Sequence, residues 1–390
     1  MILIGTDNAH GLTGALEQPD WPQLTLVEVD ALLRRYPQAG GAERLLSFSP
    51  RPFSAASVVA APLGTVFVKR HPLAIRDRNG LLEEHRLAAH LARGGALVPR
   101  VLANEHGETA IVDGKWTYEV HSVAEGVDVY ENALSWTPFL SCGHAAAAGR
   151  AMARMHEAAV GYDAVARKKQ QLVSSFSIFA DDDPPSRMSE YLRVRPLLEE
   201  YAVQRNWRES MDELLMPLHG RLRPWLRHVA PLWTHNDFHA SNLMWSSAGE
   251  DAEVTGILDF GLADRTNAVH DLATAIERNI IEWLRKDEPV ADLAHLDHLD
   301  SLLAGYEELR VLSYEEAQAL VAMLPLVHCE FALSETDYFL SILHSKEKAA
   351  LAYEGYFVDH ARWFETASGR RLLEHLALWA SEPRTRGDER

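Results

Sequence analysis

A polar stretch, WTHNDFHASNLMW (residues 233–245), places histidines, asparagines and an aspartate between apolar residues. Asn242 follows Asp237 by five positions, and a second apolar run, VTGILDFG, carries Asp259 near its end. Two short strands joined by a turn would bring these three side chains together. Their carboxylate and amide oxygens are hard ligands, which suit Mg²⁺ and are poor ligands for zinc.

This oxygen-rich trio predicts chemistry on phosphate, because Mg²⁺ in proteins usually completes its shell with substrate phosphates and water. If Asn242 and Asp259 hold the metal, Asp237 is left to orient an attacking hydroxyl group and to accept its proton. We therefore expect phosphoryl transfer that depends on Mg²⁺.

The elements that must position these residues begin with strands. The runs RLLSFS, SVVAAP and TVFVKRH, between residues 44 and 71, predict three antiparallel strands, of which the last two form a hairpin. GLLEEHRLAAHLARGG (80–95) predicts an amphipathic helix that ends at two glycines. Strand-like runs return between 98 and 126, and the chain beyond Ala124 is typical of helices, among them CGHAAAAGRAMARMHEAA (142–159).

The predicted architecture is α+β, with a small antiparallel β-rich lobe at 44–123 and a large, mainly helical lobe at 124–390. Residues 1–43 are expected to be an N-terminal extension with one short helix at 26–36. ADDDPPSRMS (180–189) predicts an exposed loop, and the charged tail from 381 to 390 is expected to fray.

Composition excludes several classes of protein. The 390 residues are 47% hydrophobic and carry a formal net charge of −18, which would repel nucleic acids and anionic membranes. Two cysteines, Cys142 and Cys329, are too few for a disulfide framework. The sequence has no signal-peptide pattern and no run of eighteen apolar residues, so we expect a cytoplasmic protein without a nucleic-acid or membrane partner.

The polar stretch resembles a known catalytic loop. HNDFHASN is similar to the His-x-Asp-x-x-x-x-Asn signature of the aminoglycoside phosphotransferase and choline kinase superfamily, and ILDFG resembles its Asp-Phe-Gly motif. The segments GILDFGLAD and GRAMARMHEA most resemble homoserine-kinase-like or hydroxylysine-kinase-like members. The resemblance implies a protein-kinase-like, two-lobed fold and transfer of the γ-phosphate of ATP to a hydroxyl group.

The same resemblance implies roles for residues around the loop. Lys69 would contact the α- and β-phosphates and pair with Glu84, although the neighbouring Glu83 is an alternative partner. Asp271 would support the catalytic loop from behind. His235 would be structural, bonding the loop and packing near the phenylalanine of Asp-Phe-Gly.

Nucleotide contacts are inferred from position. The loop SPRPFSAAS (49–57) would cover the phosphates with Ser54 and Ser57, although it lacks the glycines that protein kinases use there. The backbone from Glu119 to His121 would read the adenine edge. A further departure from the family pattern is Asn236, which replaces the usual glycine after the motif histidine.

The acceptor is expected among the C-terminal helices, where acidic and aromatic residues gather. An acidic, aromatic-lined pocket would suit an amine-bearing alcohol, although each of these residues is equally compatible with an exposed helix face. The predicted acceptor is a small molecule: an amino alcohol, a hydroxy amino acid, a sugar or an aminoglycoside. The candidate residues are Glu330, Glu335, Asp337, Tyr353, Glu354, Tyr356 and Asp359.

Two other functions remain open. A metal-dependent hydrolase would use His235 and His239 with Asp237 or His270, but the intervening residues are typical of a loop. A nucleotide-binding module without catalysis, a pseudokinase, would fit the altered phosphate loop and Asn236. His239 itself either shapes the loop or contacts substrate.

Overall fold

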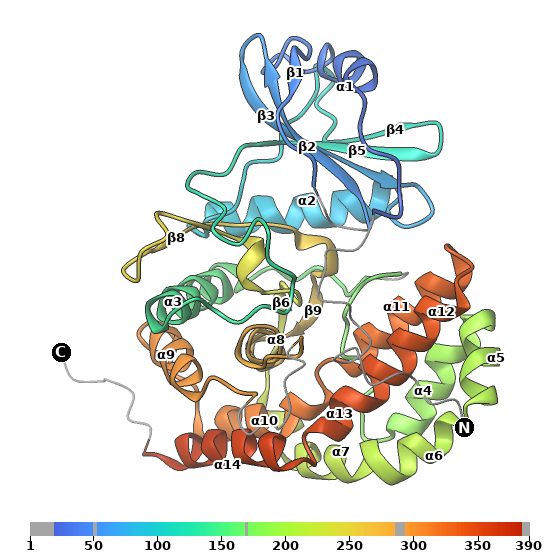
Figure 1. The fold of residues 1–390 in the computed structure, drawn as a ribbon, viewed down its shortest axis with the longest axis vertical. Coiled ribbons are helices and arrows are strands. Elements are labelled where there is room, and N and C mark those ends of the chain that lie inside the picture. Colours follow the sequence, from blue (N-terminus) through green and yellow to red (C-terminus); the bar gives the residue numbers. More distant parts are fainter. Residues whose placement is uncertain (1–18, 50–52, 168–170, 285–292, 384–390) are drawn as a thin grey trace.

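A computed structural model describes residues 19–49, 53–167, 171–284 and 293–383. The chain forms two lobes, a β-rich one above a larger helical one in Figure 1. The predicted fold class is therefore confirmed. The predicted lobe boundaries remain a prediction. Three segments that carry predictions lie outside the described residues. They are the first part of the predicted extension (1–18), part of the phosphate-covering loop (50–52) and most of the charged tail (384–390).

The upper lobe is built on a five-stranded antiparallel sheet with the order β1-β2-β3-β5-β4. Val58, Val59, Val66 and Val68 supply the β-branched side chains that favour a pleated surface. A tight turn joins β2 to β3, pairing Ala61 with Gly64. The strands are β1 (Arg44–Leu45), β2 (Ala55–Ala61), β3 (Gly64–Pro72), β4 (Ala110–Asp113) and β5 (Trp116–Ser122).

The short helix α1 (Leu26–Leu33) packs on this sheet and shares its core. Its N-terminus carries a capping box between Thr25 and Glu28, which satisfies backbone N–H groups that a helix start leaves unpaired. Val29 and Leu33 are fully buried in one cluster with sheet residues such as Val120. The described part of the predicted extension is therefore packed against the sheet.

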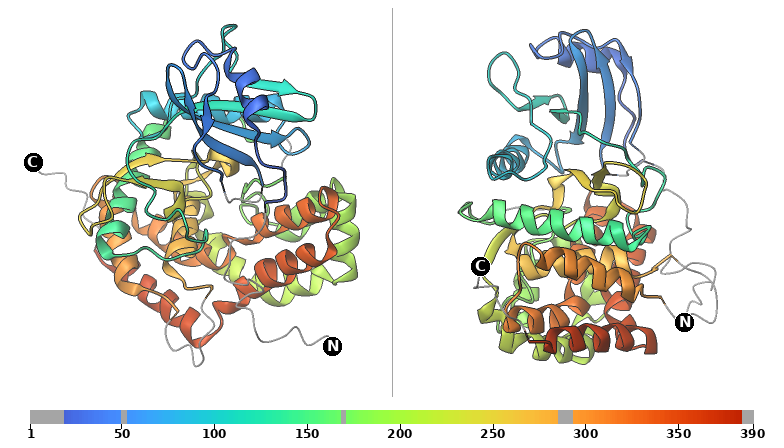
Figure 2. Two further views of the ribbon diagram at one scale, coloured as in Figure 1. Left: turned by 45° about the horizontal axis from the view of Figure 1, so that its top comes forward. Right: turned by 90° about the vertical axis from the view of Figure 1, so that its left-hand side faces the viewer.

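Helix α2 (Arg78–Arg93) lies between the sheet and the helical lobe (Figures 1 and 2). Asp77 caps its start by accepting a hydrogen bond from the Gly80 N–H. Its buried stripe includes Leu81, Leu87 and Leu91, at the spacing that sequence periodicity predicts. The helix therefore links the five-stranded sheet to the lobe beneath it.

The helical lobe begins with α3 (Cys142–Ala159), which runs beside α9 (Leu296–Glu307) (Figure 2). Glycines permit this close contact. A Cβ atom at Gly149 would lie 2.1 Å from the Leu302 carbonyl oxygen, and one at Gly305 would lie 2.1 Å from the Ala146 carbonyl oxygen. The alanine-rich helix predicted from the sequence is thus buried because the backbones of α3 and α9 come into direct contact at these glycines.

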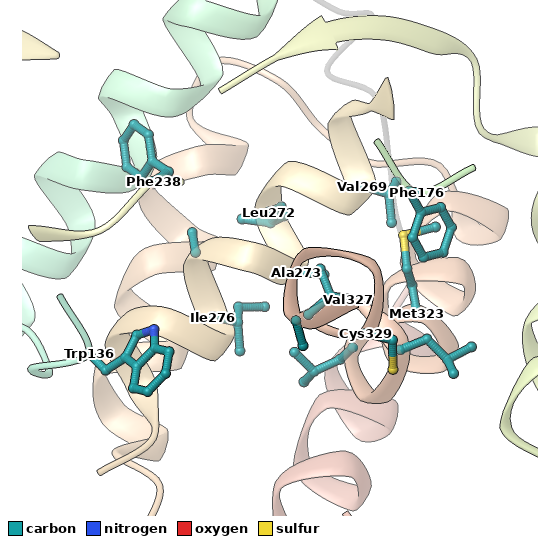
Figure 3. Close-up of a cluster of buried hydrophobic side chains, with 14 of the residues drawn as sticks. Trp136, Phe176, Phe238, Val269, Leu272, Ala273, Ile276, Met323, Val327 and Cys329 are labelled. Carbon is teal, nitrogen blue, oxygen red and sulfur yellow. The ribbon is translucent and has the colours of Figure 1, made fainter. Parts of the chain in front are cut away.

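Helix α8 (Ala268–Ile280) is the centre of this lobe, and all of its residues are buried. Val269, Leu272, Ala273 and Ile276 belong to one apolar cluster that also contains Met323, Val327, Cys329, Trp136 and Phe238 (Figure 3). Charged residues on such a helix need specific partners, because an unpaired buried charge is costly. The polar residues of α8 are therefore candidates for a role in the site.

The remaining helical segments complete the lobe around α8 (Figure 1). They are α4 (Pro184–Arg193), α5 (Pro196–Gln204), α6 (Trp207–Ser210), η1 (Met211–Leu215), α7 (Met216–Leu222), η2 (Arg223–His228), η3 (Ala240–Asn242), η4 (Phe260–Leu262), α10 (Tyr314–Met323), η5 (Leu324–Leu326), α11 (Cys329–Ser341), α12 (Lys346–Ala350), η6 (Leu351–Asp359), α13 (His360–Trp363) and α14 (Ala367–Ser381).

The loop predicted at 180–189 is wrong in its second half, because α4 starts at Pro184. Asp183 caps this helix by accepting a hydrogen bond from Ser186 N–H. Prolines fit the first turn of a helix, where their missing N–H groups would have no helical partner. The proline pair therefore starts a helix here.

The helical run Tyr314–Ser341 is long and apolar enough to cross a membrane by length and composition, with a mean hydropathy of 1.4 in its most apolar window. However, 83% of that window is buried inside the protein, as expected for a core helix of a globular protein.

Candidate active site

Two small two-stranded sheets fix the ends of the polar stretch. Strand β6 (Pro231–Thr234) pairs with β9 (Asp264–Asn267), and β7 (Leu243–Trp245) pairs with β8 (Val254–Ile257). The Asn242 carbonyl also accepts a 2.8 Å hydrogen bond from Leu258 N–H. Asn242 and Asp259 therefore lie at adjacent strand ends, as the sequence pattern predicts.

Asp271 holds the loop from behind. Its carboxylate accepts hydrogen bonds from the backbone N–H of His235 (2.9 Å) and Asn236 (2.7 Å). Burial opposes ionisation of Asp271, but a hydrogen bond from His156 and nearby positive charge hold its pKa below the ordinary value. The position of Asp271 matches the supporting role that the resemblance implies.

Asn279, also on α8, is a supporting residue that the sequence reasoning missed. Its side-chain oxygen accepts from Ala240 N–H at 2.8 Å, and its amide donates to the Phe238 carbonyl at 2.9 Å. It is fully buried. An asparagine directly before two isoleucines, Ile280 and Ile281, was the available signal, because buried polar groups need hydrogen-bond partners.

His235 is a structural residue in this geometry. Its Nε2 donates to the Leu258 carbonyl at 2.8 Å, and its Nδ1 accepts from Asp237 N–H at 3.2 Å. Its ring also lies 4.8 Å from that of Phe260, which is the packing predicted from the sequence. Because backbone groups occupy both ring nitrogens, His235 has none left for a metal, and the hydrolase interpretation loses a ligand.

The Asp237 carboxylate faces a cleft and is surrounded by positive groups. His239 Nε2 lies 3.5 Å from one oxygen, and Arg278 Nη2 lies 3.6 Å from the other. Asn242 donates to the Asp237 backbone carbonyl at 3.0 Å. Burial alone would raise the pKa of Asp237, but the adjacent His239 and the guanidinium of Arg278 lower this pKa well below its usual range. Asp237 is therefore ionised at neutral pH.

Asp259 has a left-handed backbone conformation (φ 57°), and its carboxylate caps the short turn that follows. One carboxylate oxygen, Oδ1, accepts a hydrogen bond from Lys69 Nζ at 2.8 Å. The side chain of Asp259 is 38% exposed, and the Lys69 ammonium outweighs its partial desolvation and lowers the pKa of Asp259. Within the described residues, Asp259 Oδ2 and Asn242 Oδ1 make no hydrogen bond. Two available hard oxygens at adjacent strand ends fit a Mg²⁺ ion.

The predicted pairing of Lys69 with Glu84 is wrong, because Lys69 pairs with Asp259 in the structure. Glu84 Oε1 instead accepts from Arg76 Nε and Arg167 Nη1, each at 2.9 Å. Two buried guanidinium groups already neutralise this carboxylate, so it does not need the ammonium. Glu83, the alternative partner, is only partly buried on the same helix.

Two of the predicted nucleotide contacts lie within the sheet. Glu119 pairs with Lys69 on β3 and with Ala110 on β4, and His121 pairs with Phe67 on β3. The Glu119 carboxylate is buried, and its oxygens lie 2.8–2.9 Å from nitrogens of three histidines, among them His121. Strands β3 and β4 pair with this part of β5 on its two sides. Its backbone N–H and C=O groups therefore bond neighbouring strands and are not available to bind the adenine edge. The segment after Ser122, where the strand ends, is the better candidate.

The phosphate-side serines differ from each other. Ser54 lines the cleft. Ser57 lies within β2, where its hydroxyl donates to the Ser47 carbonyl at 2.6 Å. The nucleotide contact predicted for the Ser57 side chain is therefore not available, because that hydroxyl already bonds the neighbouring chain.

The cleft between the lobes is less acidic than predicted. Of the seven acceptor candidates, Glu335 and Tyr356 line it. The others have different partners: Glu330 accepts from Ser177 and Ile178, for example, and Glu354 pairs with Arg205. The cleft's Lys and Arg residues are Lys69, Arg76, Arg278 and Lys348, and its carboxylates are Asp237, Asp259 and Glu335.

The protein has a β-rich lobe and a helical lobe, and Asp237 and Asp259 line the cleft between them. This arrangement is that of a phosphotransferase with a protein-kinase-like fold. Residues 53–312 match the phosphotransferase enzyme family, and the chain belongs to that family. The match confirms the superfamily and the enzyme class predicted from the sequence.

Solved structures with similar folds are also kinases. A microcompartment-associated aminopropanol kinase is 18% identical, with a TM-score of 0.56 over 91% of this chain and 98% of that one. An amicoumacin kinase in complex with AMP-PNP, Ca²⁺ and Ami is 14% identical (TM-score 0.54; 85% and 90% covered). A spectinomycin phosphotransferase with ADP and spectinomycin is 11% identical (TM-score 0.52; 91% and 98%). No curated protein matches the sequence.

Proposed function

We propose that the protein is an ATP- and Mg²⁺-dependent kinase that phosphorylates a hydroxyl group of a small molecule. The observation that carries the proposal is the convergence on one cleft of an ionised aspartate, two available hard oxygens and an ammonium group. They belong to Asp237, Asn242, Asp259 and Lys69. Phosphoryl transfer needs positioning and charge stabilisation more than covalent chemistry, and this set supplies both.

Each residue has a role that follows from its place. Asp237 would orient the acceptor hydroxyl and accept its proton, and its low pKa keeps it ionised for that task. Lys69 would balance phosphate charge from the sheet side of the cleft. Asn242 and Asp259 would hold Mg²⁺, which when bound neutralises charge on the transferring phosphate. Ser54 would lie near the phosphates.

The acceptor is proposed to be small. The chain aligns with nearly the whole length of three kinases that are named for small molecules. These molecules are aminopropanol, amicoumacin and spectinomycin. The net charge of −18 makes nucleic acid and anionic membranes unfavourable partners. We propose that the reaction takes place in the cytoplasm, where ATP is available.

The substitution Asp237→Asn tests this function. It should lower turnover about 100-fold or more, the scale of a positioned base. Nucleotide affinity should stay nearly unchanged, because in the proposed arrangement Asp237 meets the acceptor hydroxyl and Lys69 and the metal meet the phosphates. The assay is Mg²⁺-dependent ADP release across amino alcohols, hydroxy amino acids, sugars and aminoglycosides, with AMP-PNP binding followed by calorimetry.

Asp251→Asn is the matched control, because Asp251 is exposed on the turn between β7 and β8. It should behave as the wild type. Wild-type turnover in Asp237→Asn would overturn the proposal. Silence of the wild type with every acceptor, with AMP-PNP still bound, would favour the non-catalytic module.

A further inference from the structure

Arg278 is a buried arginine that points into the same cleft. It lies on α8 seven residues after Asp271, so both side chains leave the same face of the helix, toward the catalytic loop. Arg278 is only 4% exposed, and its guanidinium carbon lies 5.2 Å from the Trp136 ring centre and 5.3 Å from that of Phe331. The aromatic rings therefore hold the guanidinium at the cleft wall.

Among the residues that the structure describes, the guanidinium group of Arg278 has no acceptor closer than 3.5 Å. Its ion pairs are loose, at 3.6 Å from Nη2 to Asp237 and 3.5 Å from Nε to Glu277, and Nε is buried without a hydrogen bond. Within the described residues, Arg278 donates no hydrogen bond at all. A guanidinium carries five N–H donors, and leaving them unsatisfied in a buried site is costly.

The neighbouring carboxylate does not satisfy it either. Glu277 is buried and faces away toward two histidines, with His360 Nδ1 at 3.1 Å and His328 Nδ1 at 3.6 Å. On the other side of Arg278, the Asp237 carboxylate lies 3.5 Å from His239. In the proposed mechanism this carboxylate also receives the acceptor hydroxyl, so it does not serve as the main partner of Arg278. The arginine fork is therefore anchored from behind and open toward the cleft, which is the usual arrangement for recognising a planar anion.

We propose that Arg278 binds a carboxylate of the acceptor, and that the acceptor is a small hydroxy acid, with or without an amine. This inference rests on the proposed kinase function, because it assumes that Asp237 receives the hydroxyl group. The hydroxyl and carboxylate oxygens of one acceptor would lie at most about 9 Å apart, given two hydrogen bonds of about 2.8 Å and the 3.6 Å gap between Asp237 and Arg278.

The charges of the cleft agree with this assignment. Although the protein is strongly acidic overall, Lys and Arg side chains outnumber carboxylates along the cleft. Lys69 and Asp259 pair with each other on the phosphate side, whereas Arg278 lies against Asp237 and two aromatic side chains. The unsatisfied cation is thus placed beside the acceptor hydroxyl, where it would favour an anionic acceptor over a purely cationic one.

Acceptors that differ only in this charge provide the test. The pairs are L-homoserine with L-homoserine amide, and 4-hydroxybutanoate with 4-hydroxybutanamide, assayed by ADP release and by detection of the phosphoester. For a pair that is turned over, we expect kcat/KM about 10- to 100-fold higher for the acid, the scale of a charge-assisted hydrogen-bond pair.

Arg278→Gln and Arg278→Lys should remove most of this preference. The loss should come mainly through a higher KM for the acid, while KM for the amide and for ATP changes little. Arg278→Lys keeps the charge without the fork, and it serves as the second variant if Arg278→Gln melts at a much lower temperature. Arg362→Gln, at an exposed arginine of α13, is the control and should keep the wild-type preference.

Equal kcat/KM for acid and amide in the wild type would overturn the inference. It would also be overturned if Arg278→Gln lowered kcat equally for every acceptor and slowed ATP hydrolysis without acceptor, because Arg278 would then act on the phosphoryl group. Turnover of amino alcohols but of no hydroxy acid would sink this inference and leave the kinase proposal standing. A wild type indistinguishable from Asp237→Asn in every assay would sink both.

Discussion

Asn236 occupies a position where the family pattern has glycine, and its geometry explains how it can. Its φ of 61° is in the left-handed region, which glycine adopts freely and which asparagine tolerates better than most residues. The side chain then adds what glycine lacks: it accepts hydrogen bonds from Thr234 and Thr266 and donates to the Ser174 and Leu262 carbonyls. The replacement thus strengthens the loop's attachment.

This account predicts an order of stability, with the wild type above Asn236→Gly and Asn236→Ala lowest. The glycine variant loses buried hydrogen bonds worth about 1–3 kcal/mol, and alanine adds about 1 kcal/mol of left-handed strain. Turnover should fall less than about tenfold in Asn236→Gly, because the side chain points away from the cleft. Urea denaturation measures the order. An alanine variant as stable as the glycine variant would contradict the backbone argument.

At the scale of elements, α2 is tied to the turn that carries Asp259. Arg76 and Arg167 both bond Glu84 on α2, and both also donate to backbone carbonyls of that turn, Arg76 to Gly261 and Arg167 to Phe260. One buried carboxylate therefore connects helix α2 with the turn that carries Asp259. This connection replaces the direct contact with Lys69 that the sequence predicted.

Glu84→Gln should destabilise the protein by about 3–5 kcal/mol, because it leaves two buried guanidinium groups without their carboxylate. Glu83→Gln is the matched control one position earlier on the same helix, where the side chain is partly exposed, and it should change stability by less than about 0.5 kcal/mol. Thermal and urea unfolding of both variants give the comparison. Equal stability of the two variants would show that Glu84 is not the connection.

For the whole molecule, buried histidines of the helical lobe set how stability depends on pH. Burial is the main cause that lowers the pKa of His270 and of His360 to about 4 in each case. In the unfolded chain both would have ordinary pKa values of about 6.5. Between these values the unfolded state binds more protons, so stability falls as pH is lowered from about 6.5 to about 4.

The expected slope is up to about 1.4 kcal/mol per pH unit for each of the two histidines. Urea unfolding at a series of pH values between 7.5 and 4.5 measures it. His270→Gln should lower the slope by up to about 1.4 kcal/mol per pH unit, while His106→Gln, at an exposed loop residue, should leave it unchanged. A stability that stays flat across this window would be evidence that these histidines are not buried in their neutral form.

The sequence by itself determined the fold class and brought forward the residues proposed for the site. Strand and helix periodicity are local properties, and so is the spacing that joins Asp237, Asn242 and Asp259 through two short strands. The backbone conformation at Asn236 is local as well. These features could be predicted because each depends on neighbours within a few tens of residues.

Only the tertiary structure decided which charges meet. Lys69 pairs with Asp259 across 190 positions, and Glu84 finds Arg167 across 83. The same holds for Arg278, whose place beside Asp237 depends on how α8 packs against the catalytic loop. Each buried carboxylate could pair with any of several Lys and Arg side chains. The pairs that form are those that leave the fewest buried charges unpaired, because an unpaired buried charge costs several kcal/mol. That selection depends on packing, which spacing along the chain does not encode.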